Sequence, residues 1–96
     1  MSVVIVGGNE RMERQYKDIC KSHGCRAKVF AKMPADFKRK IGSPYLIILF
    51  TSTVSHKMVE CATTEAKRQN AIVARSHSSS ACALKELLQL HCPVHA

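Results

Sequence analysis

A short, unbroken apolar run from Tyr45 to Phe50 constrains the fold of this chain more than any other segment. Ser43 and Pro44 precede the run, and threonine and serine residues follow it. An apolar run of this length between turn residues predicts a strand that is buried on both faces. Strands of that kind belong to parallel sheets covered by helices, so the run indicates an α/β domain.

The polar residues after this strand indicate where a ligand would bind. Residues 51–55 would take the chain away from the carboxyl end of the strand, and His56 would lie in the first turn of a helix that begins near Ser55. In open α/β sheets, ligands bind at this edge. We therefore expect the functional residues to gather here.

The start of the chain predicts a strand, a tight turn and a helix. Ser2 to Val6 is an apolar run that ends at a Gly-Gly-Asn turn. Apolar residues then recur at helical spacing: Met12, Tyr16, Ile19 and Cys20. Asn9 suits the N-cap of this helix, and Gly24 suits the position just after its end. The glycine pair lacks the third glycine of a dinucleotide-binding fingerprint, so a tight strand-to-helix turn competes with a nucleotide motif.

The next segment predicts an edge strand and a short helix. Arg26 to Lys32 alternates between small apolar and basic residues, and charges on an edge strand discourage further pairing. Pro34 suits the first turn of a helix, and Phe37 with Ile41 forms an apolar pair one helical turn apart. Gly42 would end this helix.

The helix that begins near Ser55 has an inner and an outer face. We expect the inner face to carry Val59, Ala62, Thr63 and Ala66, and the outer face to carry Glu60, Glu65, Lys67 and Arg68. Residues 71–74 predict a fourth short strand, followed by a polar loop from Arg75 to Ser80. Leu84, Leu87 and Leu88 have core spacing in a last helix, which Pro93 would stop.

Four strands that alternate with four helices predict right-handed crossovers and a parallel sheet. The smallest arrangement with helices on both faces has the strand order 2-1-3-4, with a switch point between the first and third strands. The expected fold is therefore a three-layer α-β-α domain, and residues 1–96 form a single unit.

Composition is typical of a globular domain, since 46% of the 96 residues are hydrophobic and 23% are charged. The longest apolar run is too short to cross a bilayer, and no basic segment precedes the first apolar run, so we expect a cytoplasmic protein. Five cysteines are an odd number, which favours reduced thiols. A small core leaves little stability in reserve, which favours a homodimer.

The net charge of +8 suits a nucleic acid, an anionic ligand or simply a well-solvated surface. Most basic residues fall on expected outer helix faces, which favours the last interpretation. Nucleic acid is an unlikely partner, because the sequence contains no helix-turn-helix signature and few aromatic residues among the basic ones.

Three loops would converge above the carboxyl edge of the sheet: residues 7–11, 51–57 and 75–80. Three helix N-termini directed toward them would favour a carboxylate or a phosphate. Arg75 would follow the fourth strand directly and lie beside the ligand, near the turn that carries His56. The candidate binding residues are Gly8, Asn9, Arg11, Thr51, Ser55, Arg75, His77, Ser78 and Ser79.

His56 can be a general base, a metal ligand or only a residue at a helix start. A positive charge is unfavourable in the first turn of a helix, so we expect a neutral imidazole with a nitrogen free to coordinate a metal. His77 competes for this role or serves as a hydrogen-bond donor, and one of Ser78 to Ser80 can be a simple helix cap.

Catalytic patterns are absent from these loops. Glu10 is the one carboxylate there, so neither a catalytic triad nor an acid/base pair is supported, and we expect no enzymatic activity. Two groups have a superficial metal spacing, but neither matches a zinc pattern: Cys20, His23 and Cys25, and then His91, Cys92 and His95.

Three segments resemble the bacterial family known as domain of unknown function 2325: VVIVGGN, LIILFTSTVSH and ARSHSSSA. The resemblance covers nearly the whole chain. Its more specific marks are the Gly-Gly-Asn opening and the stretch from Thr51 to His56, while the Arg-Ser-x-Ser segment matches at Arg75, Ser76 and Ser78. The family implies a small Rossmann-like or flavodoxin-like domain.

Some members of this family resemble haem proteins that bind dioxygen. The resemblance therefore implies haem b as the cofactor, with His56 as the axial ligand of the iron. Haem propionates would suit the positive loops, and apolar cover for the porphyrin would come from Met12, Met58 or a second subunit. The alternative is a regulatory domain that binds a nucleotide or another phosphorylated molecule at the same loops.

Overall fold

The computed structural model describes residues 2–32 and 35–91. Within these residues the strands are β1 (Ser2–Val6), β2 (Arg26–Phe30), β3 (Leu46–Phe50) and β4 (Ile72–Ser76). The helices are the short 3₁₀ helix η1 (Glu10–Met12) and the α-helices α1 (Glu13–Ser22), α2 (Phe37–Ile41), α3 (His56–Gln69) and α4 (Ala81–His91).

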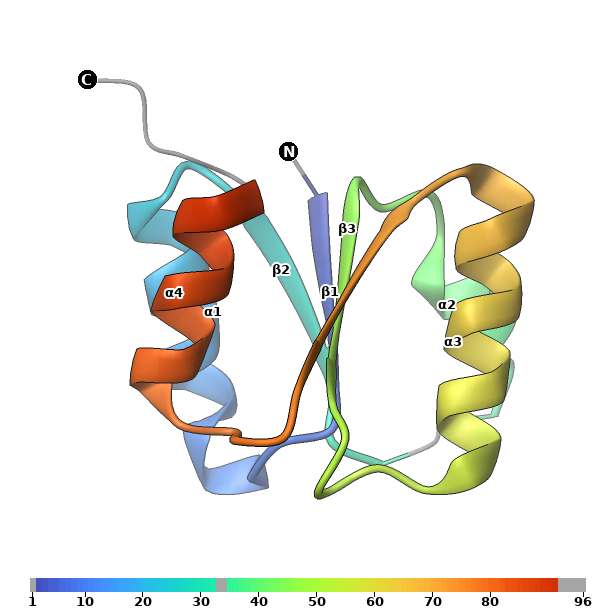
Figure 1. The fold of residues 1–96 in the computed structure, drawn as a ribbon, viewed down its shortest axis with the longest axis horizontal. Coiled ribbons are helices and arrows are strands. Elements are labelled where there is room, and N and C mark those ends of the chain that lie inside the picture. Colours follow the sequence, from blue (N-terminus) through green and yellow to red (C-terminus); the bar gives the residue numbers. More distant parts are fainter. Residues whose placement is uncertain (1, 33–34, 92–96) are drawn as a thin grey trace.

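All neighbouring strands are parallel, and their order is β2-β1-β3-β4. Helices α1 and α4 cover one face of the sheet, and α2 and α3 cover the other (Figure 1). This arrangement confirms the predicted three-layer fold and strand order. The switch point lies between β1 and β3, where the chain changes from one direction of winding to the other.

Strand β3 is the centre of the core, and each of its residues is buried, as its apolar run predicts. Leu46, Ile48 and Phe50 pack with residues of α1 and α4, whereas Ile47 and Leu49 pack with residues of α2 and α3. Side chains of a strand alternate between its two faces, so one short run supplies both halves of the core.

The predicted helix ends have local causes. Asn9 caps η1, because its Oδ1 accepts a hydrogen bond from the backbone N of Arg11 at 3.0 Å. Ser55 caps α3, because its Oγ accepts from the backbone N of Met58 at 3.3 Å. Gly24 follows α1 with a φ of 72°, which confirms its predicted position. The predicted roles of Pro34 and Pro93 lie outside the described residues.

The fourth strand differs from the prediction, which placed it at residues 71–74. Strand β4 continues to Ser76, and Arg75 and Ser76 pair in register with Leu49 and Phe50 of β3. Pairing with β3 extends β4 through these two polar residues, for which the sequence pattern predicts a loop. The connection to α4 is therefore shorter than expected.

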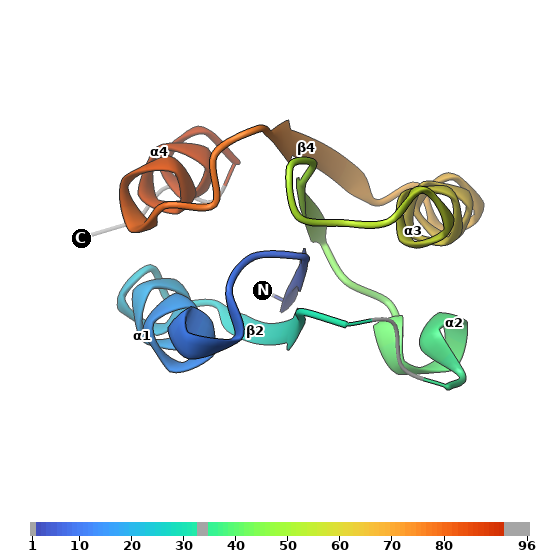
Figure 2. The same ribbon diagram turned by 90° about the horizontal axis from the view of Figure 1, so that it is seen from below.

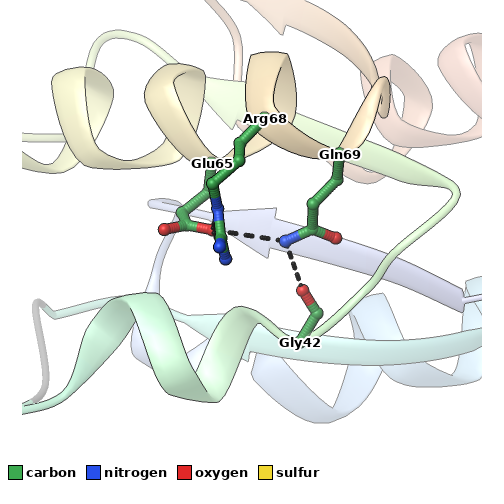
Figure 3. A network of polar contacts seen from close by, with 4 residues as sticks. All are labelled: Gly42, Glu65, Arg68 and Gln69. Carbon is green, nitrogen blue, oxygen red and sulfur yellow. Dashed lines mark hydrogen bonds and ion pairs between the residues drawn. The ribbon is translucent and has the colours of Figure 1, made fainter.

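The prediction that Glu65 lies on the outer face of α3 is wrong, because its side chain is only 6% exposed. Its Oε2 accepts hydrogen bonds from Arg68 Nη2 at 2.8 Å, Arg68 Nε at 3.2 Å and Gln69 Nε2 at 3.3 Å. Gln69 Nε2 also donates to the backbone O of Gly42 at 2.6 Å (Figure 3). The chain therefore tolerates a buried carboxylate here, since the charge is paired and hydrogen-bonded.

This network makes stability depend on pH in a defined direction. The hydrogen bond from Arg68 is the main cause that holds the pKa of Glu65 below its ordinary value of 4.5, while burial opposes the shift and Gln69 reinforces it. A lowered pKa in the folded state contributes stability above the ordinary value, and this contribution is lost as the pH falls below it.

We therefore expect acidification from about pH 6 to about pH 3 to lower the melting temperature of the wild type more than that of Glu65→Gln. Circular dichroism at several pH values measures the effect. Glu60→Gln serves as the control, because it makes the same substitution at an exposed position of the same helix. Parallel pH profiles for the wild type and Glu65→Gln would contradict the prediction.

Candidate ligand-binding site

Three loops meet at the carboxyl edge of the sheet, as predicted. They are residues 7–9 after β1, 51–55 after β3 and 77–80 after β4. Figure 1 shows these connections at the lower end of the molecule, and Figure 2 views them from below. The amino ends of η1, α3 and α4 all lie at this edge, so their backbone N–H groups give it a positive potential.

Thr53 joins the first loop to the second. Its Oγ1 accepts a hydrogen bond from the backbone N of Gly8 at 2.7 Å and donates to the carbonyl of Phe50 at 3.1 Å. The hydroxyl thus connects the end of β3 to the turn after β1, which is 45 residues away in the sequence.

Tyr16 joins the first loop to the third. Its ring is buried beside Phe50, with ring centroids 5.4 Å apart. Its hydroxyl donates to the carbonyl of Ser79 at 2.5 Å and accepts from the backbone N of Asn9 at 3.5 Å. The helical spacing of the sequence predicts Tyr16 only as a core residue, although a buried tyrosine hydroxyl usually finds a polar partner.

Contacts within the chain explain both glycines of the first loop. Gly7 and Gly8 have φ values of 94° and 87°, a region that favours glycine. A Cβ on Gly7 would lie 2.4 Å from Val54 Cγ1, and one on Gly8 would lie 2.7 Å from Tyr16 Cε2. The glycines therefore allow the loops to approach each other closely, which favours the interpretation as a tight turn.

Both candidate histidines are exposed at this edge. His56 is the first residue of α3, directly after its cap Ser55, which confirms the predicted first-turn position. His77 follows β4 directly in the third loop. Among the described residues, neither imidazole has a hydrogen-bond partner, so both remain open to a ligand.

The serines of the third loop mostly bond to one another. Ser80 Oγ accepts from the backbone N of Ala83 at 3.2 Å, which confirms that one of these serines caps α4. Ser78 Oγ lies 3.1 Å from Ser80 Oγ, and Ser76 Oγ donates to the carbonyl of Ser78 at 2.8 Å. Thr51, the first residue of the second loop, bonds to the end of β4, because its backbone N donates to the carbonyl of Ser76 at 2.8 Å.

The two arginines have different positions. Arg11 is exposed in η1, at the edge where the loops meet. The expectation that Arg75 follows the fourth strand is wrong, because Arg75 lies within β4. Its side chain lines a hollow of about 500 Å³ with Thr63 and Lys67 of α3. The longer strand therefore directs Arg75 toward the face covered by α3.

Met58, which we considered as cover for a ligand, is buried in the core with residues of α2 and β3. The exposed Glu10 pairs with Lys32 at 3.1 Å. Among the described residues, no group of three or more metal-ligating side chains is close enough to hold an ion. Cys92 and His95 of the second metal-like spacing lie outside those residues.

The fold and the position of the loops define a doubly wound, Rossmann-like or flavodoxin-like α/β domain with an open carboxyl edge. The chain belongs to a family described as uncharacterized protein conserved in bacteria, domain of unknown function 2325, whose profile matches residues 2–91. Comparison with curated proteins and with solved structures gives no match. In the described part of the chain, every helix is too short or too polar to cross a membrane.

The tight contact at Gly8 predicts a specific cost of substitution. Gly8→Ala would place a Cβ against a tyrosine ring that Ser79 holds in position, at a φ that alanine disfavours. We expect the variant to lose about 2 kcal/mol or more of unfolding free energy in a denaturant titration.

Gly24→Ala is the matched control. Gly24 also has a positive φ of 72°, but no atom lies within 4 Å of a Cβ at this position. The control should therefore lose only the backbone cost, about 1 kcal/mol. Equal losses in the two variants would show that the contact between Gly8 and Tyr16 adds nothing.

Proposed function

We propose that this chain is a non-enzymatic domain that binds haem b through His56 and, through the haem iron, dioxygen, as a carrier or as a gas or redox sensor. The resemblance described above suggests haem as the cofactor. The observation that carries the proposal for this chain is the position of His56, an exposed imidazole at the first residue of a helix beside the switch point.

The side chains at the edge suit the coordinating and anionic parts of a haem group. His56 would hold the iron, and Ser55 would hold His56 in place through the cap of α3. Arg11, Ser78 and the amino end of α4 would favour the propionates, because they offer positive charge and hydrogen-bond donors. When bound, the haem iron would supply reversible dioxygen binding.

Apolar cover is the weaker part of the fit. Met12 and Val54 are only partly buried at this edge, whereas Met58 lies in the core. One chain therefore offers little apolar surface for a porphyrin. We infer that a second copy covers the remaining porphyrin face, which extends the proposal to a homodimer.

A second candidate is a regulatory domain that binds a nucleotide or another phosphorylated small molecule at the same loops. The amino ends of three helices at one edge favour this candidate, because such ends bind anions. Several donors in these loops already have partners in the chain, including the backbone N of Gly8 and that of Arg11. Binding of a phosphate would therefore depend on the backbone N–H groups at the starts of α3 and α4.

Titration with haemin tests the role of His56. We expect the wild type to develop a shifted Soret band and His56→Ala to bind haemin at least about tenfold more weakly, because axial coordination is lost. The far-ultraviolet circular dichroism should be unchanged, since His56 is exposed. His77→Ala is the matched comparison, because it removes the other exposed imidazole of this edge, and it should keep the shifted Soret band.

The other outcomes assign the site differently. Loss of binding in His77→Ala with normal binding in His56→Ala would move the iron ligand to His77. Absence of a Soret shift in the wild type, together with retention of a phosphorylated nucleotide, would favour the second candidate. A single-stranded oligonucleotide that binds with a steep salt dependence would favour the third possibility, a basic nucleic-acid-binding domain.

Light scattering on the same samples tests the homodimer. We expect the mass of a dimer when haem is bound, because one chain would leave a porphyrin face uncovered and the outer side of β4 has no partner strand among the described residues. The variant His56→Ala, mixed with haemin, should contain less dimer. A monomer mass with haem bound would contradict the homodimer but not the role of His56.

A further inference from the structure

Among residues 2–32 and 35–91, strand β2 pairs with β1 alone and lies at the opposite edge of the sheet from β4. Figure 2 shows β2 at the rim of the molecule between α1 and α2. A groove of about 390 Å³ runs along this strand, between Lys17 of α1 and Arg39 and Lys40 of α2. We call it the β2 groove; Ala27, Lys28, Val29 and Phe30 also line it.

Part of the β2 backbone faces this groove and has no partner within the described part of the chain. The carbonyl of Phe30 accepts from the backbone N of Gly7, so it points toward β1. Successive residues of a strand direct their backbone groups to opposite sides. The N–H and C=O groups of Ala27 and Val29 therefore point to the open side, where an added strand would pair with them.

The two walls of the groove differ in chemistry. Ala27 and Val29 pack against the core beneath α1, which makes one side of the strand apolar. Lys28 lies on the other side, where its Nζ donates to the carbonyl of Lys40 at 3.2 Å, next to Arg39. An added strand would thus place alternate side chains against Ala27 and Val29 on the side of α1, where Lys17 is paired with Glu13, and against a cationic wall on the side of α2.

Charge decides which kind of strand fits. Four basic side chains line the β2 groove, and its described lining contains no carboxylate. Lys17 alone among them has an acidic partner, Glu13 at 3.4 Å. A second copy of β2 would bring like charges together, as expected of lysines that protect an edge strand. An acidic segment would neutralise them instead.

We propose that the β2 groove binds an extended acidic segment of a partner protein, which adds a strand to the sheet beside β2. Acidic residues at alternate positions face Lys28, Arg39 and Lys40, and the residues between them are apolar and face α1. Main-chain hydrogen bonds to Ala27 and Val29 supply affinity, and the charges supply selectivity. None of the residues that line the groove belongs to the three loops at the carboxyl edge.

Fluorescence anisotropy with a labelled seven-residue peptide of alternating glutamate and valine tests the proposal. We expect saturable binding at about 0.15 M salt and none by the peptide with lysine in place of glutamate. Arg39→Glu combined with Lys40→Glu should weaken binding at least about tenfold. Lys67→Glu combined with Lys85→Glu makes the same charge change on exposed parts of α3 and α4 and should weaken it less than about threefold.

Ala27→Pro separates strand pairing from simple charge attraction. Proline removes the outward N–H of Ala27 without removing a hydrogen bond to β1, so the fold should persist. We expect at least about tenfold weaker peptide binding. Normal binding by this variant would overturn the proposal, as would a single-stranded oligonucleotide that displaces the peptide and binds wild type and Ala27→Pro alike.

Amide exchange keeps the proposal testable if Ala27→Pro does not fold. In the wild type, saturating peptide should slow the exchange of the Ala27 and Val29 amides at least about tenfold and leave the Ile72 amide of β4 unchanged. Unchanged exchange at Ala27 and Val29 with peptide bound would overturn strand addition.

Discussion

The hydroxyl groups of Tyr16 and Thr53 hold together the three loops on which the proposed site depends. Tyr16 connects the turn after β1 to the start of α4, and Thr53 connects the same turn to the end of β3. Tyr16 also packs in the core beside Phe50. Tyr16 therefore belongs both to the hydrophobic core and to the hydrogen bonds between the loops. A substitution of Tyr16 would disturb both.

The same sheet presents three surfaces with different chemistry. Its carboxyl edge carries the helix starts and the exposed His56. Strand β2 carries the cationic groove, and β4 carries the hollow near Arg75. On the face covered by α2 and α3, the bonds between Glu65, Arg68, Gln69 and Gly42 connect the end of α3 to the residue after α2. Basic residues thus line both the β2 groove and the hollow near Arg75.

The sequence was sufficient to predict the strand order and the capping residues Asn9 and Ser55, because these features depend on local residues and apolar spacing. The apolar run of β3 and the Gly-Gly-Asn turn are clear examples. The buried position of Glu65 was not predicted, because a charged residue is expected on the outer face of a helix. Its position three residues after the inward-facing Ala62 nevertheless places it on the inner face. The end of β4 was not predicted, because the strand continues through Arg75 and Ser76 by pairing with β3. The local sequence shows no preference for a strand at these two residues.

The candidate site was harder to predict than the fold. Apolar spacing identified Tyr16 as buried, but it gave no information on a hydroxyl that reaches Ser79, 63 residues away. The buried position of Met58 also depends on how α3 packs against the sheet. The convergence of the loops could be predicted from topology, whereas the bonds between them could not. The roles of His56 and of haem remain predictions.

Hydrogen bonds within the chain hold the loops of the carboxyl edge in one arrangement. Amide exchange at Gly8 tests this claim most directly in the wild type and in Thr53→Val, which removes the hydroxyl at nearly constant volume. We predict slow exchange in the wild type and at least about tenfold faster exchange in the variant, with the Ile5 amide of β1 unchanged. Fast exchange of Gly8 in the wild type, or an equal rate in both proteins, would contradict the claim.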